Sequence, residues 1–222
     1  MRLIGIGVGP GDPEHLTLKA LRTLKEADQV FVPSLGRAAE IVSAHVECTP
    51  LDFGMGDAAS RDEHWDRGGA AIAEVARTGT AAFATIGDPN VYSTFTYIAH
   101  TVRALLPDVT IETVPGITAM QDLAARSGTV LAEGEERLAL VPYTAGDEKL
   151  REALQSFDTV IVYKGGRHLP QVLEAVRDAD REPVYGEELG RANQTLTAPD
   201  GRAPYFSTVI APPRREGRGG RL

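Results

Sequence analysis

The chain alternates short apolar runs with longer segments in which apolar residues recur every three or four positions. The short runs predict buried strands, and the longer periodic segments predict amphipathic helices. One helix is expected to begin after Asp12-Pro13, because Asp is a favoured N-cap and Pro a favoured first helical residue. Its apolar face would consist of Leu16, Ala20, Leu24 and Ala27.

In the first half of the chain, strands and helices alternate. The predicted strands are 3–8, 30–32 and 81–86, and the helices after the first are 38–45, 66–78 and 94–106. Such a βαβα rhythm predicts a largely parallel sheet with helices on its faces.

In the second half, strands crowd together and helices become fewer. The predicted strands are 110–114, 138–141, 159–163, 184–187, 194–197 and 205–211, and the helices are 117–126, 148–155 and 169–177. This spacing favours a mixed sheet. We therefore expect an α/β protein with an N-terminal α/β domain (1–108), a C-terminal α/β domain (109–211) and a ligand cleft between them.

Composition and charge narrow the class of protein. The 222 residues carry a net charge of -8, and a Pro/Gly/Arg-rich tail (212–222), expected to be disordered, contains four of the Arg residues. The acidic body argues against a nucleic-acid partner. No apolar run approaches the roughly 18 residues of a membrane span, and the N-terminus lacks a signal-peptide pattern. The single Cys48 excludes an internal disulfide and favours a cytoplasmic protein.

The first glycine-rich loop, 5–12, follows a predicted strand and precedes a helix, as in dinucleotide-binding proteins. The dinucleotide fingerprint nevertheless fails, because Pro10 or Asp12 stands where its third glycine is required. The Asp12 carboxylate would repel a pyrophosphate, and Pro33 stands where an acidic ribose ligand is expected. A nicotinamide-dependent oxidoreductase is thereby disfavoured, and without GxxxxGK[ST] a P-loop ATPase is excluded.

Two more loops follow predicted strands. One is Gly87-Asp88-Pro89-Asn90-Val91-Tyr92-Ser93-Thr94, and the other is Pro115-Gly116-Ile117-Thr118. Each lies at the carboxyl end of a parallel strand, where open α/β sheets bind ligands. Each loop, taken alone, is better explained as a strand-to-helix turn, the first with Ser93 or Thr94 as N-cap.

Taken together, the three loops resemble the tetrapyrrole (corrin/porphyrin) methylase family. Its pattern is a GxGPGD loop, a GDP loop about 80 residues later and a PG-[IV]-[TS] turn about 25 residues after that, and the likeness extends over residues 1–211. The resemblance implies two α/β domains, S-adenosylmethionine as cofactor, a tetrapyrrole substrate and a homodimer.

Within the family, the sequence is most similar to members that methylate precorrin-2 at C20 in cobalamin biosynthesis. The similar segments are 53–55 before Trp65, 88–94, 132–139, Tyr163-Lys164 and 204–207. Pro33 argues against the siroheme-forming members, which carry an acid there. The alternatives left open are cobalt-precorrin-2 or another corrin intermediate, a diphthamide or ribosomal-RNA methyltransferase, and a non-catalytic binding protein.

The resemblance also implies site residues. The cofactor would contact Pro10, Ile86, Gly87, Asp88, Val91, Thr118, Ala119, Tyr163, Lys164 and Gly190. The substrate would contact Met55, Tyr92, Ser93 and Thr94, and no metal site is expected. Arg37, Arg61, Arg126, Lys164 and Arg167 are candidates for binding the substrate's carboxylates.

Methyl transfer from a sulfonium to an enamine-like C20 needs proximity more than an activated nucleophile. A site built from backbone and small residues suits that chemistry. A base must still remove the C20 proton, and the sequence leaves Asp88, Tyr92, His64 and Asp52 open. His64 is also explained as a surface residue at a helix start, and Trp65 as a core anchor.

Overall fold

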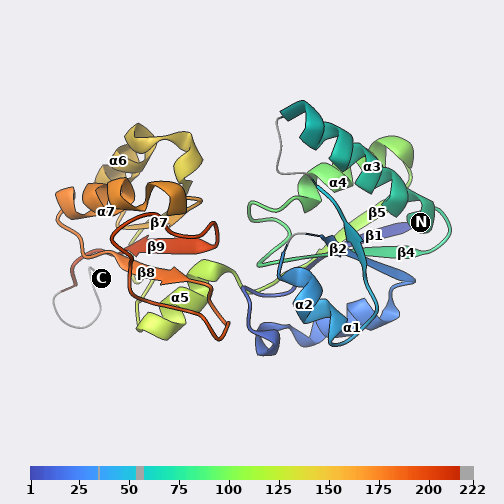
Figure 1. Cartoon of the computed structure of the whole chain (residues 1–222), viewed down its shortest axis with the longest axis horizontal. Coiled ribbons are helices and arrows are strands. Elements are labelled where there is room, and N and C mark those ends of the chain that lie inside the picture. Colours follow the sequence, from blue (N-terminus) through green and yellow to red (C-terminus); the bar gives the residue numbers. More distant parts are fainter. Residues whose placement is uncertain (35, 54–57, 216–222) are drawn as a thin grey trace. The chain divides into compact units, whose positions relative to one another are not determined.

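The computed structural model describes residues 1–34, 36–53 and 58–215, with the side chains of residues 58–61 left out of the description. The chain forms two compact units, Met1–Thr118 and Ala119–Leu222 (Figure 1). Each has its own sheet, and the predicted α/β class, with a parallel first sheet and a mixed second sheet, is confirmed.

The first unit contains a five-stranded parallel sheet in the order β3-β2-β4-β1-β5. Its strands are β1 (Arg2–Gly7), β2 (Gln29–Pro33), β3 (Thr49–Leu51), β4 (Thr80–Thr85) and β5 (Thr110–Val114). Its α-helices are α1 (Leu18–Glu26), α2 (Ala38–Ser43), α3 (Ala58–Ala76) and α4 (Phe95–Leu105). Since all the strands are parallel, their carboxyl ends meet at one edge of the sheet.

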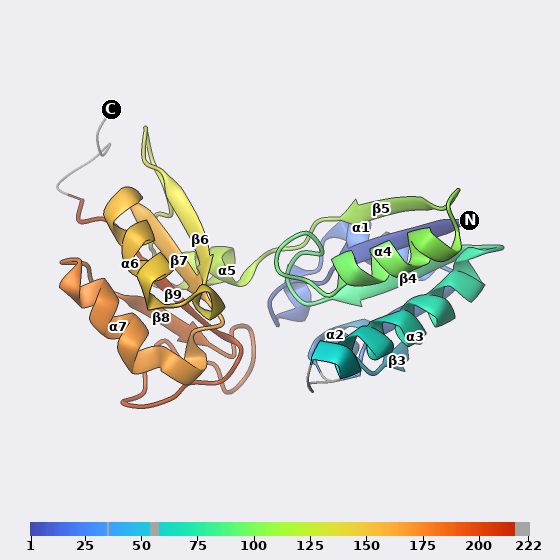
Figure 2. The ribbon, with the colours of Figure 1, turned by 90° about the horizontal axis from the view of Figure 1, so that it is seen from above.

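The alternation of side chains along the strands creates two apolar faces. Ile4, Ile6 and Val30 pack with α1 and α2 on one face. Leu3 and Phe83 pack with α3 and α4 on the other. Figure 1 shows these helix pairs on opposite sides of the sheet, and Figure 2, seen from above, shows α4 in front of the strands.

The second unit contains a four-stranded mixed sheet in the order β6-β7-β9-β8, in which only the β6–β7 pairing is parallel among the described residues. Its strands are β6 (Leu138–Pro142), β7 (Thr159–Tyr163), β8 (Val184–Glu187) and β9 (Ser207–Ala211). Its α-helices are α5 (Ala119–Ser127), α6 (Asp147–Ser156) and α7 (Leu169–Asp178).

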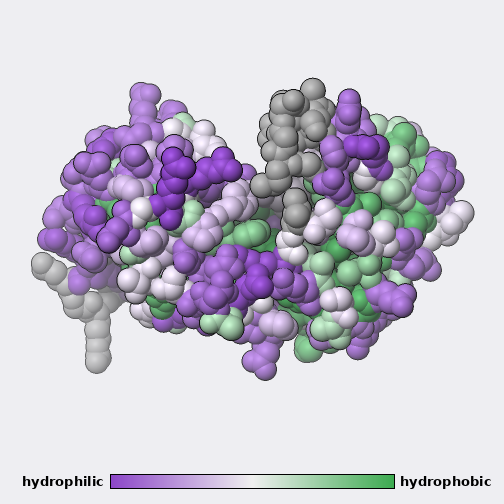
Figure 3. Space-filling view, in the orientation of Figure 1, coloured by the Kyte–Doolittle hydropathy of each residue, from purple (hydrophilic) through white to green (hydrophobic). Residues whose placement is uncertain are grey.

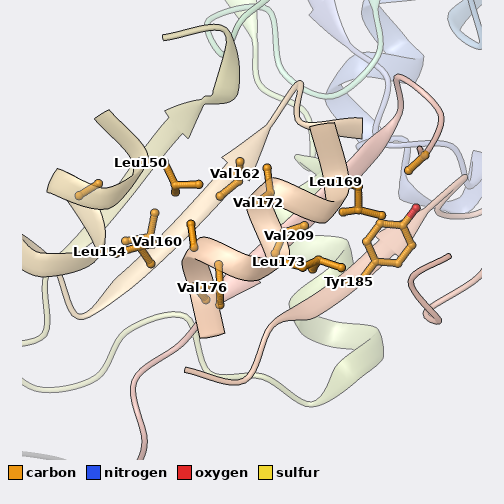
Figure 4. Close-up of a cluster of buried hydrophobic side chains, with 14 residues drawn as sticks. Leu150, Leu154, Val160, Val162, Leu169, Val172, Leu173, Val176, Tyr185 and Val209 are labelled. Carbon is orange, nitrogen blue, oxygen red and sulfur yellow. The ribbon is translucent and has the colours of Figure 1, made fainter. Parts of the chain in front are cut away.

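The core of the second unit is likewise divided by its sheet. Side chains of α6 and α7 interlock with Val160, Val162 and Val209 on one face (Figure 4). Leu123 of α5 packs against Ile161 on the other. On the face seen in Figure 3, hydrophilic residues cover most of this unit, as expected for a charged surface around an apolar core.

The structure differs from the sequence predictions at several places. The expected domain boundary at 108/109 is wrong, because β5 pairs with β1 in the first unit, which extends to Thr118. β3 was not expected, and the strand expected at 194–197 is only a bridge between Thr195 and Glu187. The helix expected after Pro13 is a 3-10 turn, Pro13–His15, followed by α1, because Thr17 provides a second N-cap by accepting the Ala20 N–H.

The expected disordered tail is wrong for its first residues. Arg214 pairs with Asp180 at 2.8 Å, and Arg215 pairs with Glu136 and Glu133. Residues 216–222 lie outside the described residues.

Candidate functional site

Three loops at the carboxyl edge of the parallel sheet contact one another through their glycines. The Gly87 N–H donates to the Gly9 carbonyl at 2.8 Å. A Cβ on Gly7 would lie 2.5 Å from the Gly87 carbonyl oxygen and 2.6 Å from the Gly116 nitrogen. Any side chain at Gly7 or Gly116 would therefore force the three backbones apart.

The carboxylate of Asp88 joins two of these loops. Its Oδ1 accepts the Asn90 N–H at 2.8 Å, and its Oδ2 accepts the Gly116 N–H at 3.0 Å. Asn90 also donates through its side chain to Thr113 Oγ1 at 3.1 Å. Both Asp88 oxygens thus hold the second loop and its connection to the third.

The space beside Gly87 is suited to a ligand. Gly87 has φ 69°, and a Cβ built on it would meet nothing within 4 Å. Open space over a backbone fixed by its neighbours is what a closely bound small molecule requires. The predicted cofactor residues Pro10 and Thr118 are buried in the same unit, and Ile86 and Val91 are half-buried in it. These residues fit a cofactor held by backbone and small side chains.

The predicted substrate residues at the start of α4 have different roles. Ser93 Oγ accepts the Phe95 N–H at 3.1 Å and donates to Thr85 Oγ1 at 3.2 Å, so Ser93 supplies the side-chain cap. Thr94 is the N-cap residue by position but makes no side-chain cap bond. Tyr92 has φ 49° and is 46% exposed. Burial of part of the ring raises the pKa of the Tyr92 phenol, which makes its anion scarcer.

The remaining predicted cofactor residues lie in the second unit. Ala119 begins α5, and the next residue, Met120, donates its N–H to the Tyr163 hydroxyl at 3.0 Å. Lys164 has φ 59° at the end of β7. Gly190 has φ 77°, and its N–H donates to the Gln194 side chain at 2.9 Å.

The two other candidate bases lie together beyond β3. His64 Nε2 lies 3.6 Å from Asp52 Oδ2, and both residues line a pocket of about 230 Å³. The pocket is completed by Leu51, Arg67 and Gly68. Met55 lies outside the described residues. Trp65, predicted as a core anchor, is half-buried and stacks on Tyr97 with ring centroids 4.1 Å apart.

The predicted carboxylate-binding cations are not equally accessible. Arg37 is buried, and Arg126 donates to the buried Asp122 at 2.8 Å. Arg167 is exposed, and the Arg61 side chain lies outside the description. Arg67, which lines the pocket with His64, was not among the predicted cations. Its only sequence signal is its spacing three residues after His64, on the same helix face.

Metal-ligand clusters and membrane-spanning helices are both missing from the described ranges. Among these residues, His, Cys, Asp and Glu side chains do not gather in any group of three suited to a metal ion. None of the helices in residues 1–34, 36–53 and 58–215 has the length and apolarity needed to cross a bilayer.

Comparison with known proteins identifies the family to which the sequence is similar. The family described as Tetrapyrrole (Corrin/Porphyrin) Methylases matches residues 2–202. The chain is 29% identical to the precorrin-2 C(20)-methyltransferase of Sinorhizobium sp, over 95% of both chains. It is 26% identical to the cobalt-precorrin-2 C(20)-methyltransferase of Salmonella typhimurium, over 94% of this chain and 95% of that protein.

The fold is shared with solved structures. Uroporphyrin-III C-methyl transferase from Thermus thermophilus, complexed with S-adenyl homocysteine, aligns with a TM-score of 0.68 at 22% identity, covering 96% of this chain and 97% of that one. The three glycine loops, the two units with a sheet each, and the family match over residues 2–202 all indicate the same family. The chain belongs to the tetrapyrrole (corrin/porphyrin) methylase family.

Proposed function

We propose that this chain transfers a methyl group from S-adenosylmethionine to C20 of precorrin-2, a step of cobalamin biosynthesis. The observation that carries the proposal is the set of three glycine loops, the first joined to the second by the Gly87–Gly9 hydrogen bond and the second to the third by Asp88, in a chain of the tetrapyrrole methylase family. The choice of C20 is supported by full-length relatives named as C(20)-methyltransferases.

The cofactor would be held by Pro10, Ile86, Gly87, Val91 and Thr118 in the first unit. S-adenosylmethionine supplies an electrophilic methyl group. The chain's own contribution is to fix the backbone around Gly87 before binding, so little conformational entropy is lost when the ligand is ordered. Holding the methyl donor and C20 in register can contribute roughly 7–11 kcal/mol to the rate enhancement.

The second unit would contribute Ala119, Tyr163, Lys164 and Gly190 to the cofactor. The Tyr163 hydroxyl fixes the first turn of α5 by accepting the Met120 N–H. Gly190 and Lys164 have left-handed backbone conformations, with φ 77° and 59°, and both lie outside the strands of the second sheet. These features support a role for both loops in ligand contact.

The substrate's metal state, the oligomer and the location complete the proposal. The relatives include one named for precorrin-2, at 29% identity, and two named for cobalt-precorrin-2, at 33% and 26% identity. Identity therefore does not choose between the two rings, and we propose the metal-free ring as substrate, with cobalt-precorrin-2 as the alternative. The family resemblance supports a homodimer. The single cysteine supports a cytoplasmic location. Light scattering after size exclusion measures the oligomer directly.

The test is calorimetry with S-adenosylhomocysteine on Gly87→Arg and on its matched control, Gly128→Arg. The two glycines have φ 69° and 68°, and a Cβ on either meets nothing within 4 Å, so the backbone strain of substitution is the same. Binding in the micromolar range should be lost in Gly87→Arg and kept in Gly128→Arg. Equal binding by both variants would contradict the assignment of this site.

A further inference from the structure

The pocket beyond β3 contains a titratable side chain that the cofactor site does not use. His64 lies on α3 with its imidazole partly buried, 20% of its surface remaining exposed, and Asp52 follows directly after β3. Their side chains approach to 3.6 Å at the wall of a pocket of about 230 Å³. This volume is below the roughly 300–1,000 Å³ of ordinary ligand sites, so it would accept one edge of a macrocycle.

The pocket and the glycine loops lie at the same edge of one sheet. β3, β4, β1 and β5 are all parallel, so Asp52 and the loops after the other strands share the carboxyl edge. β3 is separated from β4 only by β2, and adjacent strands lie about 4.8 Å apart, so the spacing is roughly 10 Å. A four-ring tetrapyrrole is wide enough to extend from one to the other.

The other candidate bases are less suited to accept a proton. Both Asp88 oxygens accept backbone N–H groups, and protonation would break that connection. Burial raises the pKa of the Tyr92 phenol, so its basic form is rare near neutral pH. An imidazole accepts a proton readily at that pH, and a nearby carboxylate stabilises the imidazolium that forms.

From this geometry we propose that His64 removes the C20 proton after methylation, with Asp52 as the group that stabilises the protonated ring. The proposal rests on the proposed C20 methylation. After methyl transfer C20 carries both the new methyl group and its original hydrogen. The His64 imidazole takes that hydrogen as a proton, the C–H electron pair returns to the conjugated ring system, and the imidazolium then releases the proton to solvent.

The charged groups around His64 suit this role. Asp52 faces the imidazole from the end of β3, and Arg67 contributes a cation to the same pocket from α3. On the same helix, Asp66 is engaged by the Thr101 hydroxyl of α4 at 3.3 Å. Arg67 provides a partner for a substrate carboxylate, which would keep the ring edge next to His64.

The test measures proton exchange at C20 without any methyl donor. Precorrin-2 is bound anaerobically to the protein in deuterated water with S-adenosylhomocysteine, and deuterium at C20 is followed by mass spectrometry and NMR. The wild-type protein should catalyse exchange, because the same imidazole can deliver and remove a proton at this carbon. The exchange rate should fall about 100-fold or more in His64→Gln, the size expected for a general base.

Two variants and one binding measurement keep the result interpretable. His45→Gln, which removes an exposed histidine of the same unit, should exchange like the wild type. Asp52→Asn should slow exchange about two- to tenfold, since its carboxylate is 64% exposed and its effect is screened. Precorrin-2 affinity, measured by absorbance titration, should stay within about threefold in His64→Gln.

The outcomes separate this inference from the proposed function. Exchange that persists in His64→Gln, or its absence in wild-type protein that binds precorrin-2, would overturn the role of His64. It would leave C20 methylation untouched. Failure of the wild-type protein to bind precorrin-2 at all would overturn the proposed function itself.

Discussion

At the scale of single residues, Asp88 shows how one carboxylate can connect two loops of the candidate site. Its two oxygens accept N–H groups from Asn90 and Gly116, which belong to different loops. Hydrogen bonds to a charged group are each stronger than neutral ones. The shape of the backbone around Gly87 therefore depends on a carboxylate next to it.

We expect Asp88→Ala to lower the free energy of unfolding by about 2–3 kcal/mol, because two backbone donors lose a charged acceptor. Affinity for S-adenosylhomocysteine should fall with it, since the loops are no longer fixed. Urea denaturation and calorimetry measure the two effects. Asp108→Ala, at an exposed position of the same unit, is the control and should change neither. An Asp88→Ala protein of wild-type stability would show that the two bonds do not hold the loops.

The candidate site residues differ in how far sequence could identify them. The loops were predictable because glycine and proline spacing records backbone requirements, and Gly7 and Gly116 are needed where backbones touch. The sequence left Ser93 and Thr94 open as the N-cap, a choice that the Phe95 bond to Ser93 decides. It did not show that Ser93 also bonds to Thr85, nor that Arg67 shares a pocket with His64. Those facts depend on how α3 and α4 pack, which no local pattern contains.

At the scale of elements, Arg181 binds the end of α6 to the strands of the second unit. Its guanidinium donates to three carbonyl oxygens at 2.6–2.7 Å, those of Leu154, Phe157 and Asp158. Burial lowers the pKa of the Arg181 guanidinium, yet the group faces the negative end of a helix. The planar guanidinium of Arg181 has several N–H donors and can therefore bind several carbonyl oxygens at once.

Arg181→Lys should therefore destabilise the protein by about 2 kcal/mol, because one ammonium cannot reach all three carbonyls. The measurement is urea unfolding. Arg177→Lys, at an exposed position near the end of α7, serves as the matched variant and should have little effect. Equal stability of the two variants would contradict the role given to Arg181.

Ion pairs join Arg215 of the tail to the segment before β6. Arg215 donates to Glu136, with one bond of 3.0 Å, and to the Val130 carbonyl at 2.9 Å. The Arg215 hydrogen bond lowers the pKa of Glu136 below its ordinary value of 4.5. A lowered folded-state pKa stabilises the fold above the unfolded pKa and loses that contribution as the pH falls through the folded value.

We accordingly expect wild-type protein to be more stable than Glu136→Gln above about pH 5. The difference should shrink as the pH falls through the lowered pKa of the folded-state Glu136 carboxyl, where the wild-type carboxylate becomes protonated. Unfolding by urea across this range tests the sign. A difference that stays constant down to pH 3 would show that the pairing with Arg215 does not depend on charge.

The elements themselves were largely predictable, and the exceptions have physical causes. β3 is only three residues long and contains Pro50, so it has no strand signature. β5 was assigned to the second half because strand pairing is nonlocal, and its apolar pattern fits either sheet. Tail residues Arg214 and Arg215 have a composition typical of disorder, but acidic partners fix them.

At the scale of the whole molecule, each unit has a core of its own. None of the described clusters of buried apolar residues contains residues from both units. The cleft expected between the units stays a prediction. A ligand that binds only the native protein nevertheless stabilises the molecule by mass action.

S-adenosylhomocysteine at 100 times its dissociation constant should raise the free energy of unfolding by about 2.7 kcal/mol. The thermal midpoint should rise with ligand concentration in wild type and in Gly128→Arg, and it should not move in Gly87→Arg. Differential scanning calorimetry provides the measurement. A ligand-dependent shift in Gly87→Arg would mean that the ligand is bound elsewhere.

The proposed transfer of a methyl group to C20 is tested by locating a labelled methyl group in the product. The protein is incubated anaerobically with precorrin-2 and S-adenosylmethionine carrying a carbon-13 methyl group, and the product is examined by NMR. If the chain methylates C20, the product shows a single new methyl signal, coupled to the ring carbons that flank C20. A labelled methyl at any other ring position, or a wild-type protein that binds both molecules and transfers no label, would contradict the proposed transfer.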